Sequence, residues 1–323
     1  MPNLATREAY GKALVELGKE NRNVVVLDAD LSKSTKTADF AKVFPERFFN
    51  IGIAEADLMG TAAGLATCGK IPFASTFAVF ATGRAFEQIR NSICYPNLNV
   101  KIAATHAGIT VGEDGASHQS IEDISLMRTI PNMTVIVPCD DVETMAAIKA
   151  AAEYVGPVYI RLGRSSVPTI NDEHTYKFEI GKVVKLREGK DVTIFATGIM
   201  VSEALKAYEM LKEKGFEAEV INIHTIKPID AKAIVESVAK TGCAVTCEEH
   251  NIIGGLGSAV CEVLAENKPA PVVRVGVKDT FGESGKPAEL MKHYGLTAEN
   301  IVEAALKAMS KSSIPGFSRI FCR

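Results

Sequence analysis

Glu55 is a carboxylate within a stretch of apolar and small residues, NIGIAEADLMGTAAGLA at positions 50–66. A helix that begins near Ala54 would place Glu55, Leu58 and Ala62 on one face, because they follow the helical repeat. Carboxylates are favoured in a first helical turn, where they meet the positive end of the helix dipole, so a structural role explains Glu55 alone. A catalytic role requires a partner group that interacts favourably with a buried carboxylate.

Two phenylalanines in STFAVFATGRA, residues 75–85, are candidates for that partner. Phe77 and Phe80 are three positions apart and could present two rings on one side of a helix start. Such rings would form an apolar wall for a flat heterocycle. The same spacing also occurs in ordinary hydrophobic cores, and Phe86 continues the stripe, so both interpretations stay open.

A glycine-broken loop, ATHAGITVGEDGASHQSIED at positions 104–123, gathers side chains that can carry charge or move protons. They are His106, Glu113, Asp114 and His118. Its three glycines permit positive φ and sharp turns, which can bring polar groups to one point. The alternative is an ordinary surface loop in which Ser120 and Asp123 cap the next helix.

Polar side chains also follow two of the predicted strands. YIRLGRSS, residues 159–166, places Arg161 and Arg164 just past a buried strand, where α/β proteins bind ligands. Each arginine could hold an anion or form a salt bridge that fixes the next segment. DADLSKSTKT, residues 28–37, similarly puts Ser34 beyond a strand.

The elements that must position these residues alternate between apolar runs and helical patterns. The runs NVVVLD, IPFAS, NVKIAAT, MTVIVP and PVYIRL predict a mostly parallel sheet covered on both faces. A polar segment follows, and then the alternation resumes. The sequence predicts two consecutive three-layer α/β domains, residues 1–164 and 181–309, joined by a linker, 165–180. Residues 310–323 have no usable period and are expected to be a disordered or foreign tail.

Composition narrows the function classes. A formal charge of −3 gives no long-range attraction for nucleic acid or an anionic membrane. Seven cysteines form no CxxC pair, and no HExxH, GxGxxG or GKS/GKT motif occurs. No apolar run approaches the roughly 20 residues of a membrane span. We therefore expect a cytoplasmic protein without a metal site of its own and without nucleic-acid or membrane partners.

Six segments taken in order resemble the C-terminal half of transketolase up to about residue 309. They are the three quoted first, then GPVYIRLGRS, INIHTIKPID and EEHNIIGGLGSAV. The GEDGxxHQ segment and the helix start at Glu55 are typical of thiamine-diphosphate enzymes. The family's GDG motif, which holds the cofactor's diphosphate and Mg²⁺, is missing. The chain thus resembles one subunit of a split transketolase, which implies an N-terminal diphosphate-binding partner subunit.

The resemblance implies roles for individual residues. Glu55 matches the glutamate that hydrogen-bonds the aminopyrimidine ring, and Phe77 and Phe80 match the wall that stacks on it. A carboxylate there would share a proton with the ring, while His118 could move a hydroxyl proton as the carbon–carbon bond breaks. Glu55 and His118 are therefore the expected catalytic residues.

The positions that match substrate-binding groups are Ser34, His106, Asp114, His118 and Arg164. Asp114 and His118 match groups that face the donor sugar, and the other three match groups that hold the acceptor's terminal phosphate. At two positions the chain departs from the transketolase pattern, and these departures bear on the sugar more than on the cofactor. Ala107 stands where many transketolases have aspartate, and Gly83 stands where many have an aromatic ring.

The implied activity is transfer of a two-carbon ketol unit from a ketose phosphate to an aldose phosphate. The implied assembly has two copies of each subunit, with self-association through the C-terminal domain. The alternatives are a deoxyxylulose-phosphate synthase, the beta subunit of a 2-oxo-acid dehydrogenase, and a non-catalytic scaffold subunit. Synthases of the first kind carry arginine at the position of His106 and a loop one residue shorter, so the loop favours transketolase.

Overall fold

The N-terminal sheet is built from short apolar runs that are buried on both faces. The computed structural model describes residues 3–312. The strands of this sheet are β2 (Val24–Asp28), β3 (Phe48–Asn50), β4 (Ile71–Ser75), β5 (Lys101–Ala104), β6 (Thr134–Ile136), β7 (Val158–Arg161) and β12 (Thr225–Lys227). Their order is β12-β6-β7-β5-β4-β2-β3, and every neighbouring pair from β6 to β3 is parallel. The predicted parallel sheet is confirmed.

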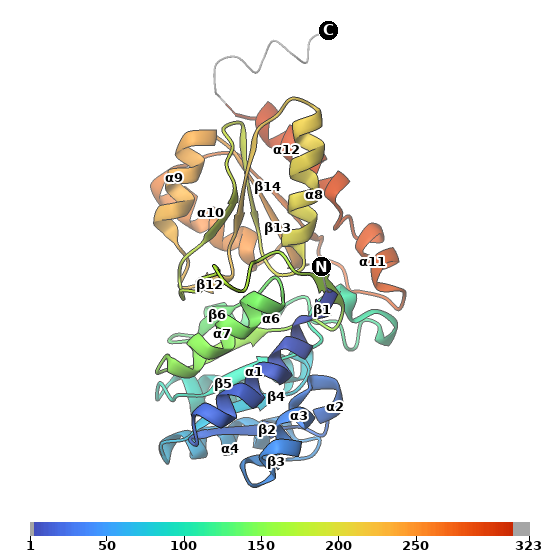
Figure 1. The fold of residues 1–323 in the computed structure, drawn as a ribbon. Coiled ribbons are helices and arrows are strands. Elements are labelled where there is room, and N and C mark those ends of the chain that lie inside the picture. Colours follow the sequence, from blue (N-terminus) through green and yellow to red (C-terminus); the bar gives the residue numbers. More distant parts are fainter. Residues whose placement is uncertain (1–2, 313–323) are drawn as a thin grey trace.

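Helices cover both faces of this sheet because successive strand residues point to opposite sides. Val24 and Val26 of β2 pack with one set of helices: α1 (Thr6–Glu20), α3 (Thr37–Val43) and α7 (Asp141–Glu153). Val25 and Leu27 pack with the other set: α4 (Glu55–Thr67), α6 (Asp123–Thr129) and the segment that contains α5 (Phe86–Gln88). The result is the predicted three-layer arrangement (Figure 1).

The C-terminal sheet repeats this layering. Its strands are β9 (Val184–Arg187), β10 (Val192–Ala196), β11 (Ala218–Asn222), β13 (Ala244–Asn251) and β14 (Val272–Val277), in the order β14-β13-β10-β11-β9. All neighbours are parallel except the edge strand β9. In Figure 1, α9 (Ala231–Thr241) and α10 (Leu256–Asn267) lie on one side of the sheet, and α8 (Met200–Glu213) and α12 (Ala298–Ser310) on the other. The helix α11 (Pro287–His293) lies beside the junction with the N-terminal sheet.

Two contacts join the two halves, and a short two-stranded sheet anchors the segment between them. Strand β12, which comes from the C-terminal half of the sequence, pairs antiparallel with β6 of the N-terminal sheet. The segment after β7 forms β8 (Ser166–Pro168), which pairs with β1 (Asn3–Ala5). Arg161 Nε forms a buried ion pair with Asp123 at 2.8 Å, and Arg161 also donates to the Glu249 carbonyl on β13. One hydrophobic cluster accordingly includes residues of both sheets.

Helix α12 ends at Ser310, the first residue of the predicted tail. The predicted tail begins at residue 310, and its part from residue 313 onward lies outside the described residues.

Candidate active site

The candidate residues gather at one edge of the N-terminal sheet because that is where its parallel strands end. Ser34 follows β2, in α2 (Ser32–Thr35), and Glu55 follows β3. Phe77, His106 and Arg164 come after β4, β5 and β7 respectively. Residues that are far apart in the sequence therefore reach the same edge.

Glu55 is the first residue of α4, as the helical repeat predicts, and its side chain is only 5% exposed. Its Oε1 accepts a hydrogen bond from Arg84 NH1 at 3.1 Å. The Arg84 guanidinium carbon also lies 4.2 Å from the centre of the Phe80 ring. The buried carboxylate is therefore linked to the aromatic wall through one planar cation.

Four rings form the centre of the site. Phe77 and Phe80 are nearly parallel with centroids 5.8 Å apart, so the prediction that both rings share one side is confirmed. His106 stacks on Phe77 at 3.8 Å, and His118 meets Phe80 edge-on at 5.4 Å. The local backbone differs from the predicted helix start, because Phe80–Arg84 is a π-helix, a rare form that is frequent at functional sites.

Arg7 holds His106 in one protonation state. Arg7 NH1 lies 3.2 Å from His106 Nε2 and donates to the Ser34 carbonyl at 2.9 Å. Because arginine can only donate, Nε2 must accept, and the His106 proton then resides on Nδ1, which lies 2.9 Å from Thr105 Oγ1. Burial, and then the positive charges of Arg7, Arg164 and His118, lower the pKa of His106 to about 3.

Arg164 connects the glycine-broken loop to the end of β7. It donates to the Val111 carbonyl and forms ion pairs with Glu113 at 3.5 Å and Asp114 at 3.6 Å. Asp114 is thus engaged with Arg164 in this arrangement, and no hydrogen bond or ring contact described in residues 3–312 joins it to the four rings. Arg164 and Arg7 place two guanidinium groups at this end of the site and both lower the pKa of His106, while Glu113 and Asp114 offset the charge of Arg164.

Hydrogen bonds from β13 and from within the loop fix the backbone of the glycine-broken loop. Its three glycines adopt positive φ, as predicted, and residues Ile109–Asp114 form a 3-10 helix. Thr110 N donates to Glu249 Oε1 on β13 at 2.6 Å. The Gln119 amide donates to the Ile109 and Gly112 carbonyls at 3.2 and 3.1 Å. His118 is left half-buried beside Phe80, with its Nδ1 2.9 Å from Ser117 Oγ.

The structure decides between the alternatives for the Ser120–Asp123 pair and for Arg161. Ser120 and Asp123 do not form a capping pair, since α6 begins at Asp123 without a side-chain cap. Asp123 instead accepts hydrogen bonds from Arg161 and Tyr159 in the interior. Arg161 is a buried structural residue, because its guanidinium is committed to Asp123 and to main-chain carbonyls.

The structure adds two residues that the sequence did not single out, Arg7 and Arg84. Arg7 lies in the first turn of α1, far in sequence from His106. Arg84 lies at the end of the π-helix, next to Gly83, and its contact with Glu55 depends on that backbone. No motif or repeat in the sequence signals either contact.

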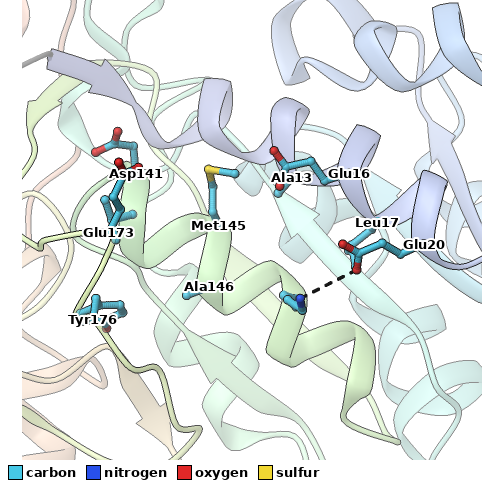
Figure 2. Close-up of a pocket in the computed structure, with 11 residues that line it drawn as sticks. Ala13, Glu16, Leu17, Glu20, Asp141, Met145, Ala146, Glu173 and Tyr176 are labelled. Atoms are coloured by element: carbon cyan, nitrogen blue, oxygen red, sulfur yellow. Dashed lines mark ion pairs between the residues drawn. The ribbon is translucent and has the colours of Figure 1, made fainter.

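A cavity of about 300 Å³ between α1 and α7 is separate from this site. Figure 2 shows acidic side chains around it, namely Glu16, Glu20, Asp141 and Glu173. Lys149 pairs with Glu20 at 3.8 Å and compensates only part of this charge. The lining includes none of the candidate residues, and its negative charge would repel a sugar phosphate.

No group of three or more His, Cys, Asp or Glu side chains within residues 3–312 could hold a metal ion. No helix in this range has both the length and the apolar character needed to cross a bilayer.

Comparisons with known proteins agree with this architecture. Residues 2–169 match the family described as transketolase, pyrimidine binding domain, and residues 181–301 match transketolase, C-terminal domain. The chain is 56% identical over 307 residues to a putative transketolase C-terminal section from Methanocaldococcus jannaschii, which covers 94% of this chain and 96% of that protein. It is 47% identical over 299 residues to a 6-deoxy-6-sulfo-D-fructose transketolase subunit from Clostridium sp. (strain MSTE9), covering 93% of this chain and 92% of that one.

A solved structure gives the same result in three dimensions. A split gene transketolase, described as an inactive beta4 tetramer, matches with a TM-score of 0.90 and 64% identity over 96% of this chain and 99% of that one. The two family matches follow one another in the order that the motifs suggested. The chain therefore belongs to the transketolase family of thiamine-diphosphate-dependent enzymes, and it corresponds to the C-terminal section of a split transketolase.

Proposed function

We propose that this chain is the pyrimidine-binding subunit of a two-subunit transketolase that transfers a two-carbon ketol unit from a ketose phosphate to an aldose phosphate. The observation that carries the proposal is the grouping of a buried carboxylate with four rings at one sheet edge. Glu55 connects to Phe80 through Arg84, and Phe80 contacts Phe77 and His118. A scaffold subunit has no need for this arrangement.

The residues fit the aminopyrimidine end of thiamine diphosphate. Such a ring needs a hydrogen-bond acceptor beside it and an apolar face to stack on. Glu55 supplies a buried carboxylate oxygen, and Phe80 supplies a half-buried ring. The Arg84 guanidinium, which is planar and bears N–H groups, already makes both contacts and shows that a flat donor fits there.

The diphosphate and Mg²⁺ would be held by a separate N-terminal subunit. The sequence has no GDG motif, and residues 3–312 contain no cluster of metal ligands. The cofactor supplies the carbanion chemistry when bound. In our proposal Glu55 holds a proton at the pyrimidine ring, and His118, through Nε2, moves a hydroxyl proton of the donor sugar.

The end of the site that carries Arg7 and Arg164 would bind the terminal anion of the sugar. Arg7 and Arg164 would donate to this anion, while His106 and the Ser34 carbonyl, which accept from Arg7, would position its guanidinium. Asp114 would face a donor hydroxyl after release from Arg164. A sulfonate is the alternative anion, since the Clostridium relative is named for a sulfosugar.

Partner and assembly are also part of the proposal. The expected complex has two copies of each subunit and associates through the C-terminal domains. The similarity to a protein that forms an inactive beta4 tetramer supports self-association of this subunit and inactivity without its partner.

The test is reconstitution of this chain with a diphosphate-binding subunit, Mg²⁺ and thiamine diphosphate. Glu55→Gln should lower turnover by roughly 10²-fold or more, because general acid–base residues contribute at that level. Asp57→Asn is the matched control, since Asp57 lies on the exposed side of the same helical turn. Unchanged turnover in Glu55→Gln would support the scaffold alternative.

The same assay distinguishes the rival enzymes. Xylulose 5-phosphate should serve as donor and pyruvate should not. Exclusive use of pyruvate would instead point to a deoxyxylulose-phosphate synthase or a 2-oxo-acid dehydrogenase subunit. Full activity of this chain without a partner would contradict the split-subunit proposal.

A further inference from the structure

Arg84 occupies the place that the proposed function assigns to the cofactor's ring. Its NH1 donates to Glu55 Oε1 at 3.1 Å while its guanidinium carbon lies 4.2 Å from the centre of the Phe80 ring. A hydrogen bond to Glu55 and stacking on Phe80 are the two contacts that an aminopyrimidine would make. A guanidinium can imitate such a ring because it is planar and carries N–H donors.

The surroundings of Phe80 leave little room for both groups. Phe77 lies nearly parallel to Phe80, and His118 meets Phe80 edge-on. Arg84 covers the ring as well, so an incoming heterocycle that stacks on Phe80 competes with the guanidinium. The two also compete for Glu55 Oε1.

The Arg84 guanidinium can be displaced from Glu55 and Phe80. Its side chain is 54% exposed, against 5% for Glu55, so solvent can take over the hydrogen bonds of the arginine when the pair opens. Gly83 precedes it, and a Cβ atom at Gly83 would meet nothing within 4 Å. The backbone next to Arg84 is therefore not packed against other side chains on that side.

We propose that Arg84 is a reversible occupant of the pyrimidine site, which pairs with Glu55 and covers Phe80 until the cofactor's ring displaces it. This inference rests on the proposed function, because it requires Glu55 and Phe80 to be the pyrimidine contacts. In the free subunit, Arg84 prevents Glu55 from being a buried carboxylate without a partner. In the complex, the occupied fraction reduces the apparent affinity for the cofactor.

The experiment measures thiamine diphosphate binding by calorimetry in the complex with the diphosphate-binding subunit and Mg²⁺. Arg84→Met should tighten the apparent Kd by about 5-fold, the population ratio that corresponds to an ion pair worth about 1 kcal/mol. Arg84→Lys, which keeps the charge but not the planar fork, should lie between Arg84→Met and wild type. Arg90→Met is the control, because Arg90 is exposed on the same segment and bonds Asn91 instead.

An unchanged or weaker Kd in Arg84→Met would overturn the inference and would make Arg84 a permanent support for Glu55. Glu55→Gln in the same titration separates the two proposals. If Glu55→Gln weakens binding but Arg84→Met does not tighten it, only the role of Arg84 fails. If Glu55→Gln binds as wild type does, the proposed function fails.

A second measurement covers the case in which Arg84→Met does not assemble. Crystal structures of the wild-type complex with and without cofactor should differ at this contact. We expect the Arg84–Glu55 hydrogen bond without cofactor and its absence with cofactor. A hydrogen bond retained in both structures would refute the inference without any variant.

Discussion

Arg7 and Arg164, rather than His106, supply the positive charge at the anion-binding end of the site. Burial and the neighbouring cations lower the pKa of His106 to about 3, so it is neutral near pH 7. Its Nε2 accepts from Arg7, whose guanidinium also bonds the Ser34 carbonyl. His106 thus acts as a support that fixes the direction of the Arg7 guanidinium.

Arg7→Met should therefore weaken binding of a phosphorylated acceptor. Loss of one charged hydrogen bond to a ligand corresponds to an increase in KM of about 10- to 100-fold. An unphosphorylated aldehyde acceptor should show little change in the reconstituted complex, and Arg22→Met is an exposed control. Equal losses for both acceptors would mean that Arg7 only stabilises the fold.

Residue types and their positions after strands predicted much of the candidate site, but not which side chains pair with each other in it. Phe77, Phe80, His106 and His118 could be expected to meet because they follow parallel strands or lie in one glycine-broken loop. The contact between Arg84 and Glu55 could not, because it depends on a π-helix that no periodicity signals.

At the scale of elements, the glycine-broken loop is shaped by the C-terminal domain. Glu249 of β13 accepts a hydrogen bond from Thr110 N at 2.6 Å. A Cβ atom at Gly108 would overlap the Glu249 carboxylate, and Gly108 has a φ of +85°. The loop that carries His106 and His118 therefore keeps its form through a contact between domains.

Gly108→Ala should destabilise the protein by about 3 kcal/mol or more, because a φ of +85° with a ψ of −175°, a conformation almost restricted to glycine that costs about 1–3 kcal/mol, adds to overlap with Glu249. Gly69→Ala is a matched control, with a φ of +78° and nothing within 4 Å of a Cβ atom. It should cost only the strain, about 1–2 kcal/mol. Urea denaturation measures both, and equal losses would contradict a role for the contact with Glu249.

The sequence predicted this loop's positive φ angles, since glycines mark them, but not what holds it. Thr110 and Glu249 are 139 positions apart, and a hydrogen bond of that range leaves no local pattern. The capping pair of Ser120 and Asp123 failed for a similar reason. Asp123 is used by Arg161 on a neighbouring strand, so a tertiary ion pair overrides the local preference.

At the scale of the whole molecule, three buried histidines make folding sensitive to acid. His106 lies at the active-site edge, His224 lies next to β12, and His250 lies within β13. Burial lowers the pKa of His106 to about 3 and the pKa of both His224 and His250 to about 4. In the unfolded chain a histidine takes up its proton near pH 6.5.

These pKa values give the direction in which stability changes with pH. Because the folded-state pKa lies below the unfolded one, stability is fully present above pH 6.5 and falls as the pH decreases toward 4. Each such histidine contributes a loss of about 1.4 kcal/mol per pH unit in that window. His250→Gln should flatten the pH dependence of the free energy of unfolding by up to this slope, whereas His174→Gln, at an exposed position, should not. Parallel curves for wild type and His250→Gln would refute the assignment.

The overall fold was the most predictable level. Continuous apolar runs predicted the parallel strands and both layered domains, because burial on two faces leaves a clear pattern in sequence. The pattern could not reveal that β12 joins the N-terminal sheet, since a short strand carries no mark of the sheet to which it adds.

The pairing of β12 with the N-terminal sheet has a consequence for where such a chain can be divided. A break in the segment after β7 would leave β6 as an open sheet edge, with its unpaired main-chain groups ready to recruit strands from other molecules. The other fragment would carry β12 without a sheet to receive it. Division of the chain at this junction would therefore separate β12 from the strand with which it pairs.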